Sequence, residues 1–256
     1  MRKVIALAAV LAIPAAGSAD PGTVDWGAKV VKCSGSGAPN LRDSETKGQA
    51  RIGAEKAAKL DALRNCMETI KGIQLDSSKK VGSALESDSA LNAQVQGVVK
   101  GFRVVGKPRY YEDGGVEMDV EVPLEGKLSE TLMPKGETKA VSTEGEAPGT
   151  ALVVDARGQK VAPALAPRVL DESGNEVYGP TMLNEAGRKA GGAAAYARDL
   201  ESAKKTLAAR VGDRPLVVKA VKVAGPDVVI STADAKSLAG KNLGFLAEGK
   251  VVILAD

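Results

Sequence analysis

The chain has 256 residues, and 44% of them are hydrophobic but only 3% aromatic, so valine, alanine and leucine must supply most of a core. Its formal charge of +3 argues against strong non-specific attraction to nucleic acid or to anionic lipid. The chain contains no histidine, which excludes Ser-His-Asp and Cys-His catalysis, histidine-ligated haem and nearly all catalytic zinc sites.

Residues 1–19 have the pattern of a secretory signal peptide. Arg2 and Lys3 form a basic start, Val4–Ile13 is an apolar run too short for a permanent membrane anchor, and Gly17–Ala19 is a small-residue cleavage site. A buried N-terminal helix is the alternative interpretation. We expect export, cleavage after Ala19 and a periplasmic or cell-surface location, with membrane association only indirect because no cysteine stands at the cleavage site.

Residues 20–124 predict a first α+β domain. Alternation over Val24–Gly35 predicts a strand, which the Gly35–Asn40 segment should end as a loop. Thr46–Gly72 predicts a long amphipathic helix, with a capping box at its start and a glycine stop at its end. The apolar stripe expected on this helix consists of Ala50, Gly53, Ala57, Leu60, Leu63, Met67 and Ile70.

A β-hairpin should follow, with strands over Val98–Arg109 and Val116–Leu124 and a turn over Tyr110–Gly115. In the second strand, valine and methionine alternate with acidic residues, as in a strand with one buried face. A turn centred on Asp113 places Arg109 opposite Glu117. The same register places Lys107 opposite Asp119.

Cys33 and Cys66 are the two cysteines of the chain, and in an exported protein they can form a disulfide that persists. The closed loop of about 30 residues would then stabilise the fold by roughly 3–4 kcal/mol. Two buried free thiols acting as small hydrophobic side chains are the alternative.

Residues 125–149 are rich in Glu, Lys, Thr, Gly and Pro and lack periodicity, so they predict a linker. Residues 150–256 predict a second α+β domain. Its expected elements include strands at Ala151–Ala156, Leu216–Val223 and Lys250–Leu254 and a helix at Asp199–Val211. We expect each domain to be a mostly antiparallel sheet with helices packed on one side.

Three patterns resemble catalytic or metal-binding motifs. Ser77 precedes Lys80, and Ser202 precedes Lys205, by the three residues found in Ser–Lys acyl-transfer enzymes, but the companion motifs are missing. The acidic strand face could serve a glycosidase, and the turn after Asp171 resembles half of a calcium loop. The acidic strand face consists of Glu117, Asp119 and Glu121. The calcium-like turn consists of Asp171, Ser173 and Asn175.

Each of these three patterns has a simpler structural interpretation. Solvated charge explains the lysines and the acidic strand face, and a hairpin turn explains the calcium-like segment, where Met182 holds the place of the bidentate glutamate. We therefore assign no catalytic, cofactor-binding or metal-binding residue. Tyr110 and Tyr111 at the hairpin tip are candidates for contact with a partner, with partial packing over the strand ends as the alternative.

The order of elements in residues 24–124 resembles the Lpp-twenty-type lipoprotein family, which includes or borders the bacterial flagellar assembly proteins P and T. The segments that carry the resemblance are the Trp26 strand, Gly35–Pro39, Ala57–Asn65, Ile70–Ile73 and Gly97–Val105, leading into Val116–Leu124. The resemblance implies a non-enzymatic envelope protein with a helix packed on a small sheet. The chain departs from that family in lacking a lipidation cysteine.

Together these observations predict an exported envelope protein that acts by protein–protein assembly, through other envelope proteins or through self-association, without nucleic acid or cofactor. An exported hydrolase using Ser and Lys or a carboxylate pair is the first alternative. A periplasmic carrier of a small apolar ligand held between the two domains is the second.

Overall fold

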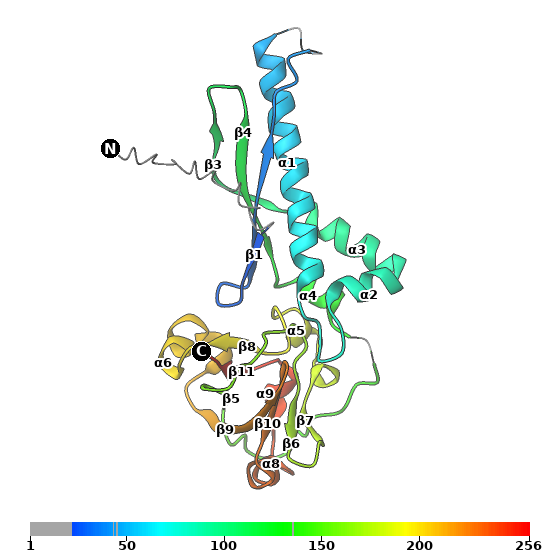
Figure 1. Ribbon diagram of the computed structural model, residues 1–256. Helices are drawn as coiled ribbons and strands as arrows, with labels where there is room; N and C mark the ends of the chain where they lie inside the picture. The colour runs from blue at the N-terminus through cyan, green and yellow to red at the C-terminus, as the bar shows by residue number, and fades with distance from the viewer. Residues whose placement is uncertain (1–21, 43, 45, 135) are drawn as a thin grey trace, which may run out of the picture.

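The computed structural model describes residues 22–256 except 43, 45 and 135, so the predicted signal peptide lies outside the described residues. The fold is α+β, as predicted. An elongated first part holds a long helix beside an antiparallel sheet, and a second part below it is built around a larger mixed sheet (Figure 1).

The first sheet is antiparallel throughout, with strand order β1-β2-β4-β3. Its strands are β1 (Gly22–Asp25), β2 (Val30–Gly37), β3 (Arg103–Tyr110) and β4 (Val116–Pro123). Helix α1 packs against β2 and β4, and α2 and α3 pack near its C-terminal end. These helices are α1 (Lys47–Gly72), α2 (Val81–Ser87) and α3 (Ser89–Val99).

The bounds of α1 agree with the predicted helix, and the Thr46 side chain caps its first turn by accepting from the Gln49 amide. The predicted left-handed glycine stop is wrong, because Gly72 is the last helical residue and Ile73 follows it in an extended conformation. The predicted stripe is correct at its two ends, where Ala50 and Ile70 are buried, but wrong at Gly53 and at Leu60, which is 67% exposed. The remaining members are partly buried: Ala57, Leu63 and Met67. The buried row instead repeats every four residues and consists of Ala50, Ala54, Ala58, Ala62, Cys66 and Ile70. Hydrophobic periodicity selects bulky side chains, whereas this helix buries its small ones.

Two glycines explain why small side chains are needed on α1. The predicted first strand is two strands, and β2 extends as far as Gly37, into the segment expected to be a loop. A Cβ atom on Gly35 would overlap the backbone of Ala62, and one on Gly37 would overlap that of Ala54. Strand and helix backbones therefore lie in close contact, which only glycine facing alanine permits.

A disulfide joins Cys33 of β2 to Cys66 of α1, with their Cα atoms 5.5 Å apart, so the first of the two alternatives for these cysteines is the one observed. Both residues are buried. The bond fixes the helix against the sheet near the centre of their contact.

The predicted hairpin is present, and Arg109 lies opposite Glu117 as expected. The predicted pairing of Lys107 with Asp119 is wrong, because Val105 lies opposite Asp119. The register shifts between Val105 and Arg109, where Gly106 adopts a φ of 71°. This bulge adds residues to β3 that a simple two-residue alternation does not anticipate.

The segment predicted to be a linker begins with a packed helix, α4 (Lys127–Leu132). Leu128 and Leu132 are buried, and the Ser129 hydroxyl donates a 2.7 Å hydrogen bond to the Arg188 carbonyl in the second part of the chain. Two leucines one turn apart are too few to produce a recognisable period in a segment rich in polar residues.

The second sheet has the order β7-β6-β10-β9-β5-β11-β8. Its strands are β5 (Ala151–Asp155), β6 (Val169–Asp171), β7 (Glu176–Tyr178), β8 (Ala195–Ala197), β9 (Pro215–Ala224), β10 (Asp227–Ile230) and β11 (Val251–Leu254). The expectation of a mostly antiparallel sheet is wrong here, because β5, β11, β8 and β9 are joined by parallel pairings, as are β6 and β10. Short apolar runs identify buried strands but carry no information on their direction.

Short helices connect the strands of the second sheet. They are the 3-10 helix η1 (Pro180–Met182) and the α-helices α5 (Glu185–Arg188), α6 (Leu200–Thr206), α7 (Ala208–Val211), α8 (Thr232–Leu238) and α9 (Gly244–Ala247).

One hydrophobic cluster runs through both parts of the molecule, from Val31 under α1 to Ile253 in the second sheet. Trp26, in the turn between β1 and β2, meets the Tyr196 ring edge-on at 5.5 Å between centroids. The Leu165 amide also donates a 3.0 Å hydrogen bond to the Gln74 carbonyl. The two sheets therefore share a buried core.

Candidate interaction site at the hairpin tip

The turn of the β3–β4 hairpin and the first turns of α1 lie at the end of the molecule farthest from the second sheet (Figure 1). The two tyrosines predicted for partner contact lie here, and Tyr110 and Tyr111 are 46% and 52% exposed. They point in different directions, and each is fixed by its own set of contacts.

Tyr110 is held against α1. Its hydroxyl donates a 2.9 Å hydrogen bond to Glu55 Oε1, and the Arg51 guanidinium lies 3.7 Å from the centroid of its ring. Arg51 and Glu55 are one helical turn apart, so they contact the same ring from the same flank of the helix. This cation–π contact and hydrogen bond orient an aromatic side chain that remains half exposed.

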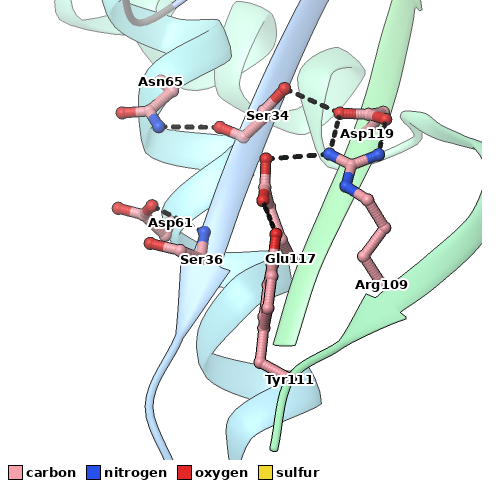
Figure 2. Close-up of polar contacts among 8 residues, drawn as sticks. All are labelled: Ser34, Ser36, Asp61, Asn65, Arg109, Tyr111, Glu117 and Asp119. Atoms are coloured by element: carbon pink, nitrogen blue, oxygen red, sulfur yellow. Dashed lines mark hydrogen bonds and ion pairs between the residues drawn. The ribbon is translucent and has the colours of Figure 1, made fainter. Parts of the chain in front are cut away.

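Tyr111 points to the opposite face of the hairpin, where its hydroxyl donates a 2.5 Å hydrogen bond to Glu117 Oε2 (Figure 2). This hydrogen bond to the carboxylate raises the pKa of the Tyr111 hydroxyl. The phenol therefore remains a donor through the neutral range and keeps its ring in place.

Arg109 holds the carboxylates of this face together (Figure 2). Its guanidinium donates to Glu117 Oε1 at 2.8 Å and to both carboxylate oxygens of Asp119. The Ser34 hydroxyl of β2 donates a further 2.7 Å hydrogen bond to Asp119 Oδ1. Hydrogen bonds from Arg109 and then Ser34 lower the pKa of Asp119 to about 2, and Arg109 followed by Tyr111 lowers that of Glu117.

The open edge of β2 is occupied by side chains from α1. Beyond Cys33, the last β2 residue paired with β1 among the described residues, Asp61 Oδ2 accepts from the Ser36 amide at 3.0 Å and Asn65 Nδ2 donates to the Ser34 carbonyl at 2.8 Å. The outer strand β3 carries a bulge and Pro108, which are features that block edge-to-edge pairing. A partner that approaches these parts of β2 and β3 is therefore expected to contact side chains rather than add a strand.

A hollow of about 350 Å³ lies between the hairpin tip and the start of α1, and it offers such a contact. Leu41, 70% exposed, stands at its rim. Other residues that line it are Pro39, Lys47, Arg51, Tyr110 and Tyr111. Its lining combines apolar residues with Lys47, Arg51, Glu112 and Asp113, a mixture that suits an apolar side chain of another protein.

The sequence predicts a role for the two tyrosines but none for Leu41 or Arg51, which line the same hollow. Leu41 was detectable as an isolated leucine in a polar loop. Arg51 was not, because its role depends on how the hairpin packs against the helix.

The serines of the Ser and Lys pairs predicted as weak catalytic candidates have other partners. Arg168 Nη2 donates a 3.1 Å hydrogen bond to the Ser77 hydroxyl, and Ser202 forms a capping box with Asp199 at the start of α6. Over residues 22–256, apart from the three positions without a description, no hydrogen bond links Ser77 to Lys80 or Ser202 to Lys205.

The acidic candidates also have partners. Glu121 pairs with Arg103 at 3.0 Å, beside the Arg109 network of the other two strand carboxylates. Asp171 accepts from the amides of Ser173 and Asn175, as expected for a turn. In the part of the chain that the structure describes, no group of three or more Cys, Asp or Glu residues is placed to hold a metal ion.

Comparison with known families matches residues 151–256 to the family described as Treponema pallidum Tp0624, second domain. No curated protein matches the chain. Among the described residues, no helix combines the length and apolarity needed to cross a membrane. The match starts at the first residue of β5 and covers less than half of the chain, so the C-terminal part of this protein is similar to the second domain of Tp0624.

Proposed function

We propose that this protein is an exported envelope protein that acts by binding other proteins and has no catalytic role. The observation that carries the proposal is the hairpin tip, where two oriented, half-exposed tyrosines border a hollow with an exposed leucine. Tyrosines held in place bind with little loss of side-chain entropy and are frequent in interface hot spots. The partner is another envelope protein or a second copy of the chain.

Two observations support the exported location. The Cys33–Cys66 disulfide belongs to a class of bond that persists outside the reducing cytosol, and residues 1–19 have the composition of a signal peptide. A relation of the first part of the chain to the Lpp-twenty-type family and to flagellar assembly proteins belongs to the same proposal, and it rests on the sequence resemblance described above.

In-cell photo-cross-linking tests the proposal. A photoreactive amino acid replaces Leu41 at the rim of the hollow, and in a control strain it replaces Ala233, an exposed residue of α8. We expect adducts with an envelope protein from position 41 and none from position 233. Cell fractionation should recover the adduct with the periplasmic or surface fraction.

Three results would contradict the proposal: protein confined to the cytosol, equal adducts from both positions, or turnover by the purified chain. A panel of ester, peptide and glycan substrates checks the last of these. Activity lost in Lys80→Ala or Glu121→Gln would favour the hydrolase instead. A compound bound at one equivalent after gentle extraction would favour the carrier.

A further inference from the structure

The second sheet has an outer face, opposite the shared core, that is covered over only part of its width. On this face α6 and α7 pack on β5, β11 and β8. Their contact buries Ala203, Leu207 and Val211 of the helical segment against Val153, Val252, Leu254 and Ala195 of the strands. The neighbouring strands β9, β10 and β6 have no equivalent helix on this face among the described residues.

The uncovered strands present apolar side chains to solvent. Val217 and Val221 of β9, the central strand of the sheet, are 52% and 55% exposed. Val229 and Leu170, which are paired across β10 and β6, are partly exposed. Val217 lies opposite Val153, which α6 and α7 bury, so the apolar surface continues outward from beneath these helices. We call Leu170, Val217, Val221 and Val229 the outer strip.

A central strand with one bare apolar face is unusual for a sheet of this kind. On one side β9 pairs in parallel with β5, and parallel strands are normally covered on both faces, whereas on the other side it pairs antiparallel with β10. An α-helix lying beside α6 and α7 would complete the layer.

The charges beside the outer strip indicate what kind of helix fits. Lys219 and Lys222 of β9 are both exposed, and neither forms an ion pair within the described part of the chain. Lys219 lies opposite Asp155, but the Asp155 carboxylate already accepts hydrogen bonds from Nε and Nη2 of Arg157. An acidic partner would neutralise the two lysines.

A second copy of this chain is a poor match for the outer strip. Two strips facing each other would bring their lysines together. A helix of a second copy could also be the occupant, but the large apolar side chains that α1 exposes, Ile52 and Leu60, are flanked by cations as well. Those cations are Arg51, Lys56, Lys59 and Arg64.

We propose that the outer strip binds an acidic amphipathic helix of a different protein, which packs beside α6 and α7 and covers β9, β10 and β6. This inference rests on the proposed function only in taking protein binding as the mode of action. It concerns a surface separate from the hairpin tip, so either site can fail its test while the other passes.

Titration of the purified full chain with designed peptides tests the inference. The probe is a peptide of about 15 residues with leucine at helical spacing and glutamate at its other positions. One control replaces glutamate with lysine, and another keeps the composition but scrambles the leucine spacing. We expect the acidic amphipathic peptide to bind at least about tenfold more tightly than either control, and more weakly as salt is raised.

Variants locate the binding. Val217→Ser with Val221→Ser should reduce affinity about tenfold or more, and Lys219→Glu with Lys222→Glu should reverse the preference between acidic and basic peptides. Val104→Ser on β3, where the valine is 43% exposed, is the matched control and should bind as the original chain does. Circular dichroism confirms that each variant is folded.

Equal affinity for all three peptides, absence of binding, or binding that the strip variants leave unchanged would overturn the inference. So would a dimer in sedimentation experiments that Val217→Ser converts to a monomer, because the occupant would then be a second copy.

Discussion

Arg109 organises the open face of the hairpin, because one guanidinium binds two carboxylates and so fixes the acceptor to which Tyr111 donates. Planar, bidentate binding of this kind is specific to arginine, and lysine would not reproduce it. Because the Arg109 guanidinium lies between them, the two neighbouring carboxylates can share one strand face without strong mutual repulsion.

The titration of Asp119 measures this arrangement directly. Its pKa is about 2 in the folded protein, below the usual value of 3.8, chiefly because Arg109 donates to it. Arg109→Gln should raise the pKa of Asp119 toward the usual value, as followed by NMR of the carboxyl carbon. Arg103→Gln, which removes the neighbouring ion pair with Glu121, should leave the pKa of Asp119 unchanged. An unchanged pKa in Arg109→Gln would contradict the network.

The pH dependence of stability follows from the same shift. A carboxyl whose pKa is lower in the folded state favours folding above its unfolded pKa, and this contribution is lost as pH falls through the folded value. For Asp119 the loss should fall between about pH 4 and pH 2. In urea unfolding series, Arg109→Gln should therefore differ most from the original chain at neutral pH and converge with it near pH 2. A difference that stays constant down to pH 2 would argue against the assigned cause.

The disulfide makes a separate residue-scale prediction. Cys33 and Cys66 close a loop over a separation of 33 residues, so reduction should lower the free energy of unfolding by about 3–4 kcal/mol. Urea unfolding with and without a reductant measures the change. The Cys33→Ala, Cys66→Ala double variant, which should not respond to the reductant, is the control. A reductant effect below about 1 kcal/mol would contradict this role.

At the scale of elements, the contact between β2 and α1 depends on the absence of side chains. Gly35→Ala should destabilise the protein by about 1–3 kcal/mol or more, because its Cβ atom would overlap the backbone of Ala62. Gly53→Ala is the matched control on the outer side of α1, where nothing lies within 4 Å, and it should stabilise by up to about 1 kcal/mol. Thermal unfolding distinguishes them, and similar effects of the two substitutions would refute the close contact.

The same contact shows what the sequence could and could not predict. The start of α1 was predictable, because Thr46 acts locally through capping, but its glycine stop was not, because Gly72 stays helical and Ile73 ends the helix in an extended conformation. Its buried face was not, since the choice between the Leu60 face and the alanine face depends on a glycine strand folded beside it. The tip tyrosines were predictable as candidates, but their opposite orientations depend on the register of β3.

At the scale of the whole molecule, the two predicted domains share a core through Trp26, Tyr196 and the packed helix α4. A common core predicts one cooperative unfolding transition. Trp26 is the single tryptophan of the chain, so its fluorescence reports on the junction, while far-ultraviolet circular dichroism reports on all elements. The two denaturation curves should coincide. Separate midpoints would mean that the parts unfold independently.

The claim that the hairpin tip is a binding surface is tested most directly by the yield of cross-linked partner in cells. With the photoreactive group at position 41, Tyr110→Ala combined with Tyr111→Ala should lower the adduct by about tenfold or more, as expected on losing interface hot spots. Val104→Ala, on the strand that ends at Tyr110 and with a side chain exposed to a similar degree, should leave the yield unchanged. Undiminished adduct from a folded double-tyrosine variant would contradict the account.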